Sequence, residues 1–208
     1  MTQVMKNKIL RNLYLQKSFG FRYIEPFVLK SSHTQQDHFM TKETLQDCHL
    51  CDGSKSAKNK IFGVGDPNSK VIFITTTPSM DQNSLEIFTK MINNVLGLSL
   101  DEIYLTSLIK CDLSEKIPNI ESYYQTCKGY ILNQLIDDKK KLIVTLGDTY
   151  NYLLETKNDL SITRGTITKW NNFDLIPIYH PSYLLRNPSL KKETFDDLKK
   201  IKLLLEQL

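Results

Sequence analysis

Hydrophobic residues follow two alternating spacings along the chain, and the alternation predicts strands and helices in turn. Short runs rich in β-branched residues predict buried strands at 71–75, 103–107, 142–146 and 175–179. Hydrophobic residues three and four positions apart predict helices at 85–96, 123–136, 148–154 and 195–208. This order favours an α/β fold: a three-layer α/β/α sandwich with a central, mostly parallel four-stranded sheet.

The chain divides into a main domain and a shorter N-terminal part. Residues 9–19 have helical spacing before Gly20, and residues 31–46 form a polar connector. We therefore expect an N-terminal helical extension and connector over 1–47, packed on a main domain over 48–208. In the last predicted strand Pro177 lacks a backbone N–H, which indicates an edge strand or an irregular end.

Composition indicates the cellular environment of the protein more clearly than its function. The 27 Lys and Arg against 23 Asp and Glu give a formal net charge of +4, which permits nucleic-acid binding without indicating it. No apolar run approaches the ~20 residues of a membrane span. The N-terminus is polar, without the apolar segment of a signal peptide, so we expect a cytoplasmic protein in a reducing setting.

The four cysteines indicate one shared metal site. Cys48 and Cys51 form a Cys-x2-Cys pair, and Cys111 and Cys127 follow much later in the chain. Two thiolates so close together can bind one metal from a single turn, and folding must bring the other two. Four separate buried thiols and two disulfides are the alternatives, and the reducing setting disfavours disulfides.

Ligands of parallel α/β sheets gather beyond the carboxyl ends of the strands, which selects the loops 75–81, 107–111 and 180–186. The last of these loops, residues 180–186, reads HPSYLLR and contains the most side chains that can take part in catalysis or binding. A histidine directly after a strand can donate to a developing anion, and the hydroxyl and arginine after it can contact phosphates. The alternative is a capping turn in which His180 only satisfies backbone groups.

Ordered segments from Cys48 to about Leu205 carry a family resemblance. They are CHLC, FGVGDPNSKVIFI, YLTSLIKC, Cys127, LIVTLGDTY, ITRGT and YHPSYLLRNPS. The chain resembles the iron-sulfur uracil-DNA glycosylases, the family 4 branch of the uracil-DNA glycosylase superfamily. The resemblance implies a [4Fe-4S] cluster on Cys48, Cys51, Cys111 and Cys127, in place of zinc.

The resemblance also implies a reaction and its residues. Members hydrolyse the bond between a flipped uracil and its deoxyribose in base excision repair, and the uracil departs as an anion. His180 falls on the family histidine that stabilises this charge, so it is the expected catalytic residue. Ser182 is then the expected phosphate contact, Leu184 the expected wedge into the duplex, and Arg186 a phosphate contact or a structural anchor. The implied partner is DNA, and we expect a monomer.

The first substrate loop departs from the family pattern. Where the family has Gly-Glu-Gly/Ala-Pro-Gly, residues 75–79 read TTTPS, so Thr76 replaces the acid that orients or activates water. A threonine hydroxyl cannot act as a carboxylate base near neutral pH. Pro78 and Ser79 remain expected substrate contacts, and Asp81 is a candidate replacement for the acid.

Two further positions of the expected pocket differ. Ser107 replaces the family asparagine that reads uracil, and it lacks the paired donor and acceptor of an amide. The family's stacking phenylalanine is also missing: Ser84 occupies its place, and Phe88, the nearest aromatic residue, is expected in the core.

Two functions remain open at this point. The first is a DNA glycosylase acting on uracil or another damaged base, which requires Thr76, Ser107 and His180 to line one pocket. The alternative is a catalytically weakened or inactive member that binds DNA or recognises damage. A third possibility, covalent capture of the abasic sugar by a histidine, is disfavoured because the chain lacks the basic, histidine-containing insertion of that branch.

Overall fold

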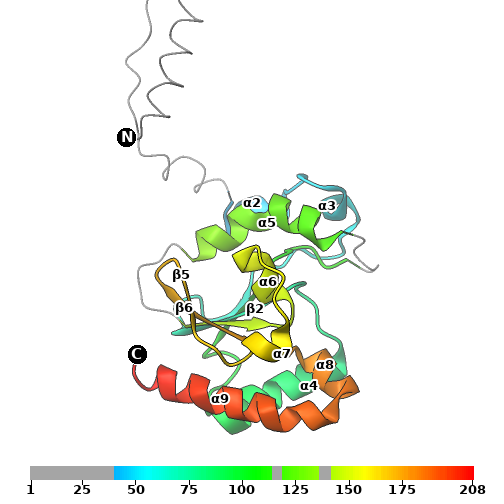
Figure 1. Ribbon diagram of the computed structural model, residues 1–208. Coiled ribbons are helices and arrows are strands. Elements are labelled where there is room, and N and C mark those ends of the chain that lie inside the picture. The colour runs from blue at the N-terminus through cyan, green and yellow to red at the C-terminus, as the bar shows by residue number, and fades with distance from the viewer. Residues whose placement is uncertain (1–39, 114–118, 136–141) are drawn as a thin grey trace, which may run out of the picture. The chain divides into compact units, whose positions relative to one another are not determined.

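The computed structural model describes residues 40–113, 119–135 and 142–208 (Figure 1). Most of the predicted N-terminal extension lies outside these residues. The strands are β1 (Val64–Gly65), β2 (Val71–Thr75), β3 (Tyr104–Ser107), β4 (Leu142–Leu146), β5 (Thr168–Trp170) and β6 (Phe173–Ile178). The helices are α2 (Lys42–Gln46), α3 (Asp52–Ser56), α4 (Gln82–Lys90), π-helix η2 (Met91–Leu96), α5 (Ile120–Gln134), α6 (Thr149–Leu154), α7 (Leu160–Thr163), α8 (Pro181–Arg186), 3-10 helix η3 (Pro188–Leu190) and α9 (Lys191–Leu205).

One sheet organises the described residues, with the strand order β1-β3-β2-β4-β6-β5. Its four central strands, β3, β2, β4 and β6, are parallel and are the four predicted ones. Two short antiparallel strands, β1 and β5, flank them and extend the sheet to six strands. The predicted α/β class and the mostly parallel sheet are confirmed, and the two edge strands are additional.

Successive residues of a buried strand point to opposite faces, and β2 shows how both faces are covered. Val71 and Phe73 pack in a cluster with α4, η2 and α9, whereas Ile72 and Ile74 pack with α5 and α6. Figure 1 shows the same arrangement, with α5 and α6 on one side of the sheet and α4, α8 and α9 on the other. Phe88 is fully buried and meets Phe73 edge to face at 5.3 Å, so it is a core residue as expected.

The segment after β2 turns into a helix at Asp81. The Asp81 carboxylate accepts hydrogen bonds from the backbone N–H and the hydroxyl of Ser84, at 3.0 and 2.5 Å. Such a cap satisfies N–H groups that have no partner within the helix. The helix continues through η2 and ends at Gly97, whose φ of 74° lies in the left-handed region that favours glycine.

The end of β6 explains how Pro177 is tolerated and corrects one expectation. β6 lies inside the sheet, between β4 and β5, so Pro177 does not mark an edge strand. Pairing with β5 stops at Leu175, and the Pro177 carbonyl accepts from the Gly165 N–H at 2.8 Å. The proline therefore lies at an irregular end of the pairing. Directly beyond it, α8 forms where a loop was expected.

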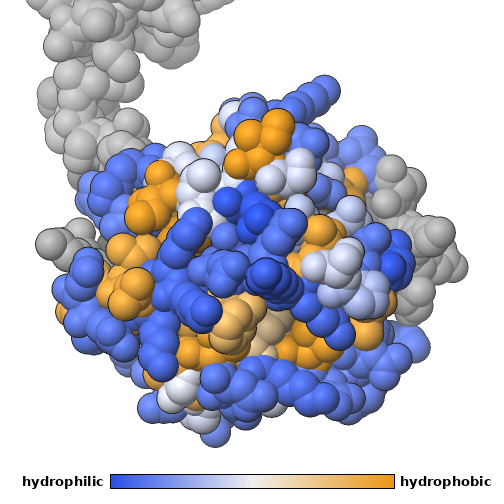
Figure 2. Space-filling model, turned by 60° about the horizontal axis from the view of Figure 1, so that its bottom comes forward, coloured by the Kyte–Doolittle hydropathy of each residue, from blue (hydrophilic) through white to orange (hydrophobic). Residues whose placement is uncertain are grey.

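In the described parts of the chain, no helix combines the length and the apolar character needed to cross a bilayer. Figure 2 shows hydrophobic residues on one face of the molecule in separate groups, divided by hydrophilic ones.

Candidate active site and cysteine site

A cavity of about 560 Å³ opens at the carboxyl ends of β2, β4 and β6. This is the edge of the sheet at which ligands of parallel α/β folds bind. The first turn of α8 and the segment around α7 complete its walls. Its lining residues are Thr76, Thr77, Ile120, Leu146, Gly147, Asp148, Tyr152, Asn158, Asp159, Leu160, Ser161, Tyr179, His180, Ser182, Tyr183 and Arg186.

His180 is both the N-cap of α8 and a wall of this cavity. Its Nδ1 atom accepts the backbone N–H of Ser182 at 3.1 Å and lies 2.8 Å from the Ser182 hydroxyl. Because Nδ1 is the acceptor, the neutral ring carries its proton on Nε2. Burial lowers the pKa of His180 from its ordinary value of 6.5, more than Asp81 raises it, and Arg186 lowers it further. The neutral Nε2–H form therefore prevails near neutral pH.

Thr76 lies in the same cavity, with its hydroxyl engaged. Its Oγ1 atom is 3.3 Å from the Oγ1 atom of Thr149, which in turn donates to the Leu146 carbonyl at 2.8 Å. Since the Thr149 proton is directed at Leu146, Thr76 is the donor in the first contact. Thr76 thus offers a substrate mainly the lone pairs of its oxygen, and no carboxylate stands at this position.

Carboxylates reach the cavity from another wall. Asp148 and Asp159 both line it, whereas Asp81 caps α4 and is not a lining residue. Asp159 caps α7 by accepting from the Ser161 N–H at 2.8 Å. Asp148 is exposed, and its carboxylate makes no hydrogen bond or ion pair with the described residues. Asp148 lies two residues after the end of β4, so the rule that selected the other three loops would have selected it as well.

Ser107 does not join Thr76 and His180. It is 1% exposed, and its hydroxyl donates to the Ile109 carbonyl at 2.7 Å. The cavity thus lies over β2, β4 and β6, and the end of β3 is outside it. Pro78 and Ser79 are likewise absent from its lining. The pocket expected from Thr76, Ser107 and His180 is present only in part.

The three residues expected to contact DNA, Ser182, Leu184 and Arg186, all lie on α8 but differ in exposure. Ser182 and Arg186 line the cavity, and Arg186 donates from Nε to the Ser182 carbonyl at 3.3 Å. Leu184 is only 1% exposed and belongs to the core, so its prediction as a wedge is wrong. In a helix, residues three apart share a face, and Pro181 and Leu184 take the inner one. Tyr183 and Leu185 are the exposed hydrophobic residues instead.

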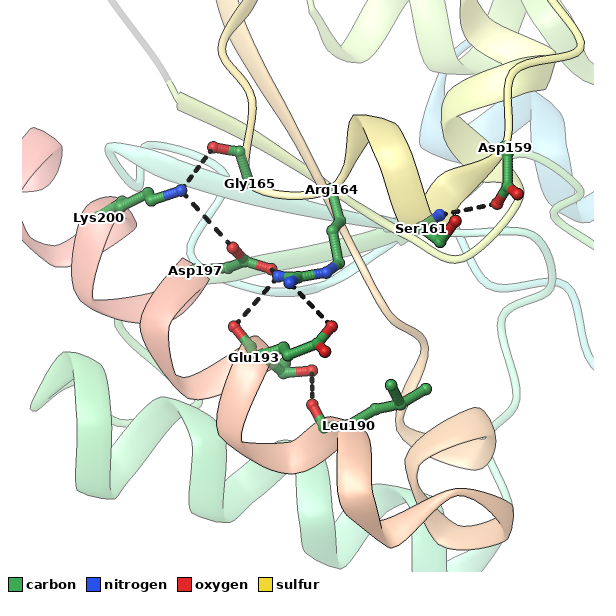
Figure 3. Close-up of polar contacts among 9 residues, drawn as sticks. Asp159, Ser161, Arg164, Gly165, Leu190, Glu193, Asp197 and Lys200 are labelled. Carbon is green, nitrogen blue, oxygen red and sulfur yellow. Dashed lines mark hydrogen bonds and ion pairs between the residues drawn. The ribbon is translucent and has the colours of Figure 1, made fainter.

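A partly buried charge network connects the segment after α7 with α9 (Figure 3). Arg164 Nη1 lies 2.7 Å from Asp197 Oδ2, and Nη2 lies 2.8 Å from Glu193 Oε2 on the same helix, α9. The Arg164 guanidinium also lies 5.7 Å from the ring centre of Tyr179, which directly precedes His180. Arg164 thereby connects the segment after α7 with α9 and with the end of β6.

The four cysteines come from three separate parts of the described chain and are all free thiols. Burial raises the pKa of Cys111 to about 11, and Cys127, Cys51 and Cys48 act in the same direction. Burial also raises the pKa of Cys127, and Cys51 and Cys48 add to this effect, while the Lys110 backbone N–H, which donates to its sulfur, opposes it. The four sulfurs therefore lie within electrostatic range of one another.

The described residues contain no group of three or more His, Cys, Asp or Glu placed to hold a metal ion. The donor chemistry of the four cysteines fits an iron-sulfur cluster, which takes one thiolate on each iron.

Fold and cavity together define an α/β domain with a neutral histidine and hydroxyl groups at the carboxyl edge of its sheet. The family model of the uracil DNA glycosylase superfamily matches residues 62–200. The chain belongs to the uracil-DNA glycosylase superfamily.

Individual relatives support the family 4 branch within it. A type-4 uracil-DNA glycosylase of Saccharolobus solfataricus is 26% identical over 178 residues, covering 77% of this chain and 82% of that protein. Its counterpart in Sulfurisphaera tokodaii is 28% identical over 179 residues, covering 77% and 81%. One from Archaeoglobus fulgidus is 25% identical over 175 residues, covering 76% and 87%.

Proposed function

We propose that this protein is a DNA N-glycosylase that hydrolyses the bond between deoxyribose and uracil or another damaged base. The observation that carries the proposal is the place of His180 in the wall of the cavity that Thr76 also lines, with Nδ1 accepting from the Ser182 N–H so that Nε2 carries the proton. Membership of the superfamily and the similarity to type-4 uracil-DNA glycosylases support it.

His180 would act on the departing base. Cleavage of the glycosidic bond leaves negative charge on the base, and a preorganised donor in a cavity lowers the energy of that charge. The Ser182 N–H fixes the ring and its tautomer before the substrate arrives, so no reorganisation is needed. Because the ring is neutral, it donates a hydrogen bond without releasing a proton to the base.

The attacking water needs a partner other than Thr76. The Thr76 hydroxyl can hold a water but cannot take its proton near neutral pH. Asp148 is the lining carboxylate without a hydrogen bond or ion pair among the described residues, and it adjoins Thr149, which contacts Thr76. We assign the orientation of the water to Asp148.

DNA would approach along α8. Ser182 and Arg186 are the proposed phosphate contacts, because both line the cavity mouth and Arg186 is exposed. Tyr183 and Leu185 replace Leu184 as the side chains available to fill the space of a flipped base.

The cofactor we propose is a [4Fe-4S] cluster on Cys48, Cys51, Cys111 and Cys127. The four cysteine donors and the similarity to type-4 uracil-DNA glycosylases support it. When bound, the cluster would supply a structural link between the segment before β1, the end of β3 and α5. The proposal also includes a monomeric, cytoplasmic protein, with residues 1–47 as an extension of the glycosylase-like domain 48–208.

A strand-cleavage assay tests the activity. Single- and double-stranded oligonucleotides carrying uracil, hypoxanthine or xanthine are incubated with the protein and then treated with alkali, which cleaves at abasic sites. We expect cleavage of at least one substrate by the wild type and its loss in His180→Ala. No cleavage above the His180→Ala level on any substrate would refute the proposal.

A second function is favoured by the position of Ser107. Its burial leaves the cavity without the base-reading group of the family, which suits a protein that binds damaged DNA without cleaving it. That function predicts salt-dependent DNA binding with equal affinity in wild type and His180→Ala, and no abasic product.

A further inference from the structure

Lys110 is a fully buried lysine beside the cysteine site. Its Nζ atom donates to Thr106 Oγ1 at 2.7 Å, to Gln134 Oε1 at 2.6 Å and to the Phe62 carbonyl at 3.3 Å. Three acceptors around one nitrogen match the three N–H groups of an ammonium ion. Burying such a charge is costly unless an opposite charge lies near it.

The hydrogen-bond partners of Lys110 are all neutral. Among the described residues, no carboxylate forms an ion pair with Lys110. The groups beside it that can become negative are the cysteines, which bind a metal as thiolates. The backbone N–H of Lys110 donates to the sulfur of Cys127, and Cys111 is the next residue in the chain. Burial lowers the pKa of Lys110 to about 7, and the charge of Cys127 opposes this lowering.

Lys60 approaches the cysteines from another segment. Its Nζ atom donates to the carbonyls of Gln46 and Cys48, both at 2.8 Å. Its backbone forms an antiparallel bridge with Cys111, and its charge acts on the Cys111 thiol. Lys60 is also without a carboxylate partner in the described residues, so two lysines from different segments lie beside the segments that carry the cysteines.

We propose that Lys60 and Lys110 are the counter-charges of the cysteine site and stabilise its metal-bound, negatively charged form. The inference rests on the [4Fe-4S] cluster proposed above, since four thiolates around such a cluster leave it with net negative charge. Positive charge near a cluster favours its reduced, more negative state and raises its reduction potential. The two lysines thus act on the charge and reduction potential of the cluster, and neither lines the cavity at His180.

The test compares purified holoproteins that lack one of these charges. Lys110→Met and Lys60→Met keep the aliphatic stem, and Lys60→Arg keeps the charge. Lys90→Met is the matched control, because Lys90 is exposed on α4 and pairs with Glu86. We measure the midpoint potential by voltammetry and the rate of iron release to a chelator.

We expect both methionine variants at positions 60 and 110 to show a lower midpoint potential and several-fold faster iron release than wild type and Lys90→Met. Lys60→Arg should resemble wild type. If Lys110→Met does not fold, the test rests on the potential and iron release of Lys60→Met, because Lys60 is partly exposed and its replacement is better tolerated. Unshifted potentials in loaded Lys60→Met protein would overturn the inference and leave the glycosylase proposal standing, whereas wild-type protein without iron would overturn the cluster and this inference together.

Discussion

The Nδ1 atom of His180 lies 3.1 Å from the backbone nitrogen of Ser182 and 2.8 Å from its hydroxyl oxygen. This pair fixes the proton of a neutral imidazole on Nε2, so the tautomer depends on the backbone and needs no other side chain. The same pair makes His180 a helix cap. Capping and catalysis, which the sequence presents as alternatives, are thus compatible in one residue.

Ser182→Ala separates the two contacts to His180. It removes the hydroxyl but keeps the backbone N–H that sets the tautomer, so we expect the glycosylase rate to fall by no more than ~10-fold, the value of one neutral hydrogen bond. Single-turnover rates on the preferred substrate measure it. A loss as large as that of His180→Ala would mean that the hydroxyl, and not the N–H, positions the ring.

The lowered pKa of His180 makes stability depend on pH. The unfolded chain binds a proton below about pH 6.5, while the folded state resists it, so the contribution to stability is present above 6.5 and is lost as pH falls toward the lower folded pKa. His180→Gln should therefore lose less stability than wild type on acidification. Urea unfolding over this range measures the difference, and parallel curves for the two proteins would contradict it.

Thr76→Glu restores an acid to the cavity. If water orientation limits the rate, we expect activity on uracil to rise by ~10-fold or more, within the usual contribution of a positioned base. Asp148→Asn should lower the wild-type rate but have a smaller effect in Thr76→Glu, because one carboxylate then replaces the other. Equal effects of Asp148→Asn in both backgrounds would show that Asp148 does not hold the water.

Ser107→Asn should not restore base recognition. Ser107 is fully enclosed and donates to Ile109, so the larger amide has no space and should destabilise the protein by about 1–3 kcal/mol. Denaturant unfolding gives the free energy, and the cleavage assay gives the activity. A stable Ser107→Asn variant with improved uracil cleavage would place the base at the end of β3 and contradict the cavity described above.

The parts of the fold that the sequence predicts are those with long, regular patterns. Among the four parallel strands, β2 and β4 are nearly continuous apolar runs with every residue buried, and they could be read directly. β1 and β5 are too short to carry a pattern, and pairing alone defines them. Helix α8 was missed for a similar reason, since residues 180–186 span too few turns to show a helical period.

The sequence predicts that His180, Thr76, Ser182 and Arg186 lie near the ligand-binding edge of the sheet, because each follows a strand end or belongs to a motif. All four line the cavity. The site could not be predicted at Leu184, whose burial depends on the unseen helix, or at Ser107, whose hydroxyl turns back to its own loop. The position of Lys60 and Lys110 beside the segments that carry the cysteines was equally hidden, because it depends on contacts between distant segments.

The most direct test of the account is the release of free base. Uracil-containing DNA is incubated with the wild type or with His180→Ala, and the free uracil is quantified by mass spectrometry, which distinguishes a glycosylase from a nuclease. We predict uracil release by the wild type and a rate ~10²–10³-fold lower in His180→Ala, as for the loss of one preorganised donor. Equal release by both proteins, or strand cleavage without free base, would contradict it.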